Sequence, residues 1–150
     1  MAVPNLQRYF ERIYDSLQSR RDCVVEELVI EESSPARSAV IEGRISFWDD
    51  STLVFTEIYT MRGVALIRTQ YVYQYHDDRG RLRFRYDNSP HYPHVETHPH
   101  HKHVVEVQRG TESVEAAKPP SLGEVLLEIE THLYPEDEDG PLDANQKGSS

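Results

Sequence analysis

The chain has 150 residues, of which 37% are apolar, and its formal net charge is −10 at pH 7. This length fits one domain with its own core, and the acidic balance argues against a protein that coats nucleic acid without specificity. No apolar stretch reaches the roughly 20 residues of a membrane span, and the first residues lack the layout of a secretory signal, so we expect a cytoplasmic protein without a membrane partner.

The charge is distributed unevenly along the chain. Residues 1–61 contain six basic and eleven acidic side chains, residues 62–103 contain seven and four, and residues 104–150 contain three and eleven. Only the middle third is therefore basic, and it also contains seven of the eight histidines. Protonation of these histidines beside a phosphate would add to its positive charge.

Hydrophobic periodicity predicts a helix followed by strands. Apolar residues recur at three- and four-residue spacing from Leu6 to Leu17, which is typical of an amphipathic helix. Alternating apolar and polar residues between short turns then predict strands at 23–30, 38–48, 52–60, 65–76 and 82–86. Because the connections are too short for a parallel crossover, we expect an antiparallel meander of about five strands.

The two faces of this predicted sheet differ in chemistry. Tyrosines and apolar residues share one parity in the last two predicted strands. The opposite parity holds polar and basic residues, namely Arg68, Gln70, Gln74, His76, Arg81, Arg83 and Arg85. We therefore predict one apolar face and one arginine-rich face.

A second helix is predicted near the C-terminus. Ser121 and Glu124 form a capping box ahead of an apolar stripe. We expect an α+β fold in which both helices pack on one face of the sheet, within a single domain of residues 1–134. Residues 135–150 are acidic and poor in apolar side chains, which predicts a disordered tail.

Six histidines lie between His91 and His103, in a proline-punctuated segment after the last predicted strand. Almost no core-forming residue occurs there, so we expect a surface loop that displays side chains for chemistry or binding. Imidazole titrates near pH 6.5 and can both accept and donate protons at cytoplasmic pH. The segment is where we expect the functional site.

Four motifs stand together in this chain: the tyrosine-rich strand at Tyr71–Tyr75, Arg-Leu-Arg-Phe-Arg-Tyr-Asp-Asn at 81–88, Pro-His-His-Lys-His at 99–103 and Pro-Ser-Leu-Gly-Glu-Val-Leu at 120–126. In this combination they resemble the TumE family, toxins of bacterial and archaeal toxin–antitoxin pairs. Three positions, Ser89, Tyr92 and His98, depart from the family pattern. The resemblance implies a type II toxin that inhibits growth and is neutralised by a cognate helix-turn-helix antitoxin.

If the resemblance holds, our first hypothesis is that the protein cleaves RNA without a metal. The reaction needs a base for the 2′-hydroxyl proton, an acid for the leaving oxygen, and cations around the charged phosphorane. The candidate acids and bases are His91, His100, His101 and His103. The candidate substrate contacts are Arg83, Arg85 and Lys102 for phosphate and Tyr86 or Tyr92 for base stacking, and Asp87 and Asn88 are candidates to orient a histidine.

Two other hypotheses stay open. Imidazole is a frequent metal ligand, so the chain could be a zinc or manganese phosphodiesterase whose ion is held by His91, His98, His100, His101 or His103. Asp87 or Glu96 could complete such a site. Alternatively, its tyrosines and arginines bind a partner and inhibit by occlusion. The alternative without a functional role is that the histidines are merely exposed, that the arginines pair with carboxylates such as Glu42 or Glu57, and that Asp87 and Asn88 form an Asx turn. The sequence also leaves a homodimer open.

Overall fold

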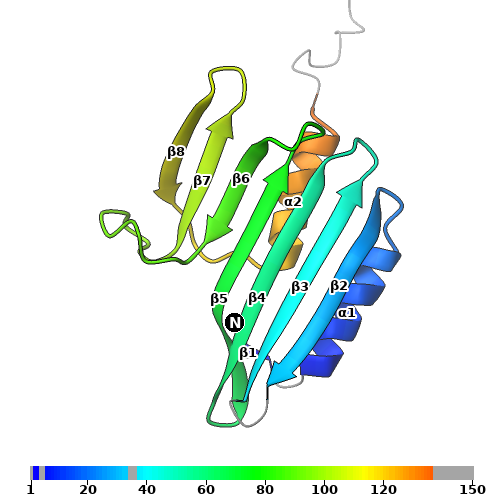
Figure 1. The fold of residues 1–150 in the computed structure, drawn as a ribbon, viewed down its shortest axis with the longest axis vertical. Helices are drawn as coiled ribbons and strands as arrows, with labels where there is room; N and C mark the ends of the chain where they lie inside the picture. The colour runs from blue at the N-terminus through cyan, green and yellow to red at the C-terminus, as the bar shows by residue number, and fades with distance from the viewer. Residues whose placement is uncertain (1, 4–5, 34–36, 137–150) are drawn as a thin grey trace, which may run out of the picture. The chain divides into compact units, whose positions relative to one another are not determined.

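The computed structural model describes residues 2–3, 6–33 and 37–136 and shows an α+β fold with one antiparallel sheet (Figure 1). Strands β2 to β8 lie side by side in chain order, and the short β1 pairs with β5 beside this path. The strands are β1 (Ala2–Val3), β2 (Cys23–Ser33), β3 (Ser38–Phe47), β4 (Thr52–Arg62), β5 (Ala65–His76), β6 (Leu82–Asp87), β7 (His101–Glu106) and β8 (Thr111–Ala116).

The expectation of about five strands was wrong, because the described meander has two more after β6. β7 begins at His101, within the segment predicted as a loop. β8, with the sequence Thr-Glu-Ser-Val-Glu-Ala, is almost wholly exposed. This edge strand is held by its backbone ladder to β7, so it carries none of the apolar alternation that identifies a strand in a sequence. Charged side chains on an edge also discourage pairing with another chain.

Burial alternates along the central strands, so the sheet has one buried face and one partly exposed face. Helix α1 (Leu6–Gln18) lies on the buried face, where Tyr9 packs against Tyr59. The opposite face, here called the open face, contains two rows of register partners. One row is Arg44, Val54, Gln74, Arg85 and His103, and the other is Glu42, Thr56, Val72, Asp87 and His101.

The prediction that Arg68 lies on the arginine-rich face was wrong, because β5 contains a β-bulge. Ile58 pairs with Gln70, but the next residue, Tyr59, pairs with Arg68, so the register shifts by one residue. Such a shift moves a side chain to the other face of a sheet. Arg68 therefore lies on the buried face, with its side chain only 4% exposed, and not on the arginine-rich face.

A polar network compensates the buried charge of Arg68. Its guanidinium lies 3.6 Å from the Glu57 carboxylate and donates to the Tyr73 hydroxyl at 2.7 Å and to the Pro120 carbonyl at 2.7 Å. The Tyr73 hydroxyl in turn donates to Glu57, and the Tyr9 hydroxyl does so at 3.0 Å. Buried ions need such partners, so the network belongs to the structure of the core.

Residues 121–136 form a separate compact unit that contains helix α2 (Leu122–Leu133). The predicted cap is confirmed, because the Ser121 hydroxyl accepts from the Glu124 backbone N–H at 3.1 Å. The packing of the two helices on one face and the single domain of residues 1–134 stay predictions, and most of the predicted tail lies outside the described residues. Within the described part of the chain, neither helix is long and apolar enough to cross a membrane.

Candidate functional site

The chain between β6 and β7 folds as a series of turns. Backbone hydrogen bonds run from Val95 to Tyr92 at 3.2 Å and from His98 to Val95 at 3.0 Å. The Thr97 hydroxyl donates to the His100 carbonyl at 2.6 Å and accepts from the Ala117 N–H at 2.9 Å. The turns return the chain to the sheet so that His101, the first residue of β7, pairs with Asp87, the last residue of β6.

Asp87, His101 and His103, here called the Asp87 cluster, meet on the open face. His101 Nε2 lies 3.1 Å from Asp87 Oδ1, and His103 Nε2 lies 3.8 Å from Asp87 Oδ2. The exposed fractions of the side chains are 2% for Asp87, 2% for His101 and 12% for His103. The imidazoles of His101 and His103 therefore each direct their Nε2 atom toward the buried carboxylate of Asp87.

The other ring nitrogens fix the tautomers of both histidines. His101 Nδ1 lies 2.9 Å from the Pro99 carbonyl oxygen, and His103 Nδ1 lies 2.9 Å from Glu112 Oε1 in β8. Both oxygens can only accept, so each Nδ1 carries a hydrogen. In the neutral rings Nε2 is then a lone pair that faces Asp87. His101 Nε2 is buried and has no aligned hydrogen-bond partner among the described residues, despite its short distance to the carboxylate.

Arg85 and Ser89 hold the Asp87 carboxylate. Arg85 Nε donates to Oδ2 at 2.8 Å, and the Ser89 backbone N–H donates to Oδ1 at 2.9 Å. Burial raises the pKa of Asp87, but the Ser89 N–H, Arg85 and His101 together bring that pKa below its ordinary value. Asp87 is therefore an anion at neutral pH, and the Arg85 side chain beside it is 35% exposed.

Tyr92 packs against both imidazoles of the cluster. Its ring centroid lies 4.9 Å from that of His101 and 5.4 Å from that of His103. Tyr92 is itself half-buried. Tyr92 therefore covers the two histidines on one side.

The four predicted catalytic histidines do not converge. His100 lies on the buried face, where its Nδ1 is 2.9 Å from the Tyr71 hydroxyl and its ring stacks on Tyr71. Burial and then Arg68 lower the pKa of His100. The side chain of His91 is exposed. Strand alternation separates His100 from His101, so only His101 and His103 lie together.

The predicted substrate contacts divide in the same way. Lys102 and Tyr86 pair on the buried-face parity, with the ammonium 5.0 Å from the ring centroid, so neither lies beside Arg85. The register between β5 and β6 shifts at Arg83, because Phe84 pairs with Tyr75 and Leu82 pairs with His76. Simple strand alternation therefore does not put Arg83 on the same face as Arg85. Asn88 bonds to the β5 backbone, donating to the Thr69 carbonyl and accepting from the Tyr71 N–H. The metal candidate His98 lies 3.1 Å from the Tyr92 carbonyl.

Sequence reasoning missed Glu112 as a contact of His103. Glu112 belongs to β8, which has no strand signal, so nothing in the sequence could relate it to the histidines. The sequence hypotheses gave Asp87 the role of orienting a histidine or of completing a metal site, and the structure places its carboxylate at the centre of the cluster.

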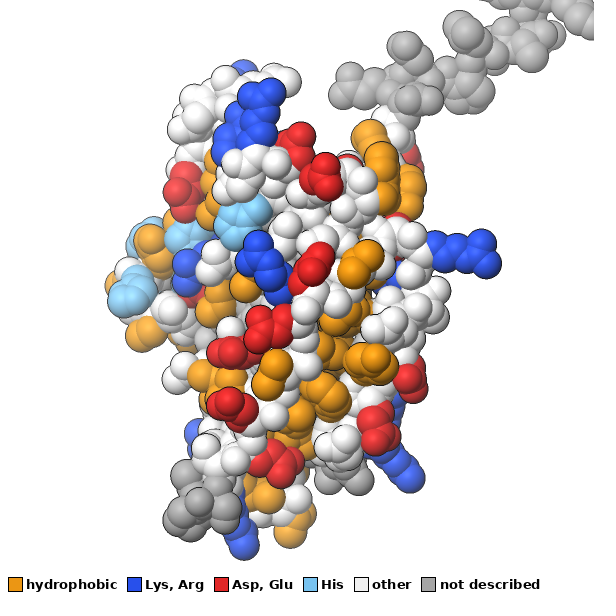
Figure 2. Space-filling view, turned by 45° about the vertical axis from the view of Figure 1, so that its right-hand side comes forward, with side chains coloured by type: hydrophobic (Ala, Val, Ile, Leu, Met, Phe, Trp, Pro, Cys, Tyr) orange, Lys and Arg blue, Asp and Glu red, His pale blue; other side chains and the backbone are white. Residues whose placement is uncertain are grey.

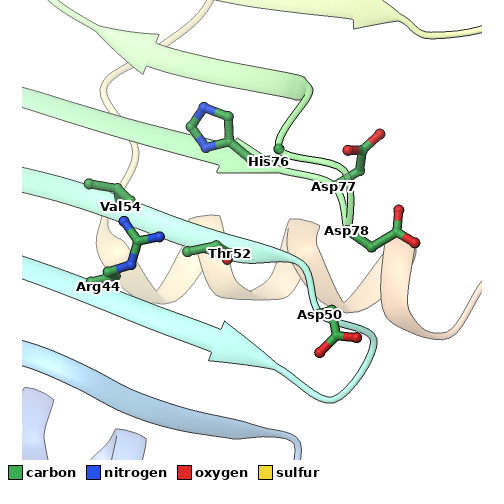
Figure 3. A pocket seen from close by; sticks show the side chains of 8 residues that line it. Arg44, Asp50, Thr52, Val54, His76, Asp77 and Asp78 are labelled. Atoms are coloured by element: carbon green, nitrogen blue, oxygen red, sulfur yellow. The ribbon is translucent and has the colours of Figure 1, made fainter.

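A polar hollow, separate from the Asp87 cluster, lies at the end of the open face. Figure 3 shows His76 from β5 and Arg44 from β3 on either side of β4, with Asp50, Asp77 and Asp78 on the neighbouring turns. Burial and then Arg44 lower the pKa of His76, which is therefore neutral at pH 7. Figure 2 shows histidine side chains gathered toward one side of the molecule, with basic and acidic side chains among them.

The comparison with family models identifies one family. The model described as Toxin TumE matches residues 10–134, which is most of the chain. No match was found among curated proteins or among solved structures. A toxin of this kind has an antitoxin as its partner. The chain belongs to the TumE toxin family.

Proposed function

We propose that this toxin acts in the cytoplasm on RNA, as a metal-independent endoribonuclease with the Asp87 cluster as its reacting centre. The observation that supports this proposal most is the shared orientation of His101 and His103, whose Nε2 atoms face one carboxylate beside Arg85. A pair of imidazoles next to a cation supplies the acid, the base and the positive charge that the reaction needs.

His103 is the more accessible histidine and suits the role of the base. Its neutral Nε2 would take the proton of a ribose 2′-hydroxyl, and Glu112, which accepts from Nδ1, would stabilise the imidazolium that forms. The 2′-oxygen then attacks phosphorus, forming a 2′,3′-cyclic phosphate as the bond to the 5′-oxygen breaks.

His101 suits the role of the acid. Beside the Asp87 anion its protonated ring would carry a hydrogen on Nε2, which would pass to the departing 5′-oxygen. The Arg85 guanidinium would stabilise the charge of the phosphorane. Because the Tyr92 ring covers His101, this side chain would turn aside when the phosphate enters.

The open face suits an RNA strand that leads to this centre. Arg44, Gln74 and Arg85 belong to one row across the sheet that ends at His103. Val54, between Arg44 and Gln74 in this row, and Gln74 itself are partly exposed. Arginine and amide side chains contact phosphates and single-stranded bases.

The test is cleavage of end-labelled RNA by purified toxin without antitoxin, in excess chelator. We expect 2′,3′-cyclic phosphate ends and a loss of about 100-fold or more in rate for His103→Gln. His94→Gln is the matched control, because His94 is an exposed histidine of the same segment. Intact RNA with the wild-type toxin, or equal rates for His103→Gln and the control, would refute the proposal.

A further inference from the structure

We infer that the Asp87 cluster binds one Zn²⁺ ion and that zinc inhibits the toxin. The inhibition rests on the proposed function, whereas the metal site does not. One ligand atom from each of Asp87, His101 and His103 lies within 4.8 Å of the other two. A tetrahedral ion with ligands at about 2.0–2.2 Å keeps them about 3.3–3.6 Å apart. His101 Nε2 lies 3.1 Å from Asp87 Oδ1 and His103 Nε2 lies 3.8 Å from Asp87 Oδ2, and these separations lie on either side of that range.

The buried nitrogen of His101 is an independent indication of a ligand. Its Nε2 faces the carboxylate without an aligned hydrogen-bond partner among the described residues. A neutral ring in this tautomer directs a lone pair at an anion, which is unfavourable unless a proton or a metal cation lies between them. Zinc between Nε2 and Asp87 would satisfy both groups.

The contacts around the three ligands fit a metal site. Each imidazole donates its Nδ1–H to an oxygen, of Pro99 in one case and of Glu112 in the other, which directs Nε2 inward. Metal-binding histidines ordinarily have such a contact, because it fixes the tautomer and raises the basicity of the ligand. The positive charge of Arg85 opposes the binding of a cation, but this charge is already paired with the Asp87 carboxylate at 2.8 Å.

The donor set favours zinc over the common hard cations. Two imidazoles and one carboxylate are ligands that zinc accepts, and they leave a fourth position for water. Magnesium and calcium require more oxygen ligands than the cluster provides. Zinc would bind the same Nε2 atoms that the proposed acid and base need for their proton transfers, so the ion and the RNA reaction exclude each other.

The binding test uses Zn²⁺ and Co²⁺ with the metal-free toxin. We expect one equivalent of zinc by equilibrium dialysis and the visible absorption of tetrahedral cobalt. His101→Gln and His103→Gln should each weaken binding at least tenfold, and Glu112→Gln about tenfold to 100-fold, since Glu112 only orients a ligand. Circular dichroism of each variant confirms its fold. Glu112 is 53% exposed, so its variant tests the site even if the buried substitutions unfold the protein.

The controls are His91→Gln and His94→Gln, two exposed histidines outside the cluster. We expect both to bind zinc like the wild type. Equal loss in these controls would place the metal on exposed histidines and overturn the inference. So would the absence of stoichiometric binding, or unchanged binding in Glu112→Gln and His103→Gln.

An RNA assay during zinc titration separates the two proposals. We expect the metal-free toxin to cleave RNA and lose activity with the midpoint of zinc binding. Cleavage without zinc binding overturns the metal site and leaves the proposed function. Zinc binding that activates an inactive metal-free toxin supports the site but overturns both the inhibition and the metal-independent reaction. Bound zinc without any effect on cleavage overturns the inhibition.

Discussion

Replacement of Glu57 by glutamine, which keeps the shape of the side chain but removes its charge, should strongly destabilise the fold. Glu57 is fully buried, and its carboxylate lies 3.6 Å from the guanidinium of Arg68, whose side chain is 4% exposed. At an effective dielectric constant of about 20, this separation corresponds to about 4.6 kcal/mol of attraction. Removing one partner of a buried pair ordinarily costs about 3–5 kcal/mol, because the other charge is left uncompensated.

A double-mutant cycle tests this reasoning. Glu57→Gln, Arg68→Met and the double variant are unfolded in urea, followed by circular dichroism. We expect each single variant to lose about 3–5 kcal/mol, and the double variant to lose at least about 1 kcal/mol less than the sum. Tyr73→Phe is a matched control that removes the bridging hydroxyl but neither charge. Additive single effects would refute the coupling, and so would a Glu57→Gln variant as stable as the wild type.

Three further predictions concern the core, the pH response and the site. Gly43→Ala should lower the free energy of unfolding by about 1–3 kcal/mol, measured in urea, because an added Cβ would lie 2.2 Å from Phe55 Cε1; wild-type stability would show that the ring moves freely. Burial and Arg44 lower the pKa of His76 in the folded state, so the unfolded chain binds a proton at His76 first and the free energy of unfolding decreases as the pH drops below about 6.5. His76→Gln should flatten this part of the curve of unfolding free energy against pH, and an unchanged curve would contradict the prediction. In the RNA assay Arg85→Ala should reduce the rate at least about tenfold and Lys102→Ala less than about twofold, since the two side chains lie on opposite faces; equal losses would contradict the proposed centre.

Alternation and capping made much of the fold predictable. β3 and β4 have apolar residues on one parity, and their predicted positions agree with the structure within a few residues. The Ser121 cap and the following apolar stripe likewise predicted α2. These signals are local, because neighbouring residues determine which face of a strand or helix is buried.

The features that were not predictable depend on partners distant in sequence. β8 is a strand because β7 provides hydrogen bonds along its edge, not because of its own apolar pattern. The bulge in β5 that buries Arg68 has no signature in the parity of that strand.

The candidate site was predictable as a segment but not as a geometry. The density of histidines marked residues 91–103, yet the position at which β7 begins decides which imidazoles face Asp87. That register places His101 and His103 on the open face and His100 on the other. It also brings Glu112 to His103, which composition could not indicate.

Growth after induction of the toxin in cells without its antitoxin tests the central claim most directly, namely that the Asp87 cluster produces the toxicity. The strains express the wild type, His103→Gln or the exposed-loop control His94→Gln, and immunoblots confirm equal amounts of protein. Our account predicts growth arrest by the wild type and by His94→Gln, and continued growth with His103→Gln. Equal arrest by all three proteins would contradict it.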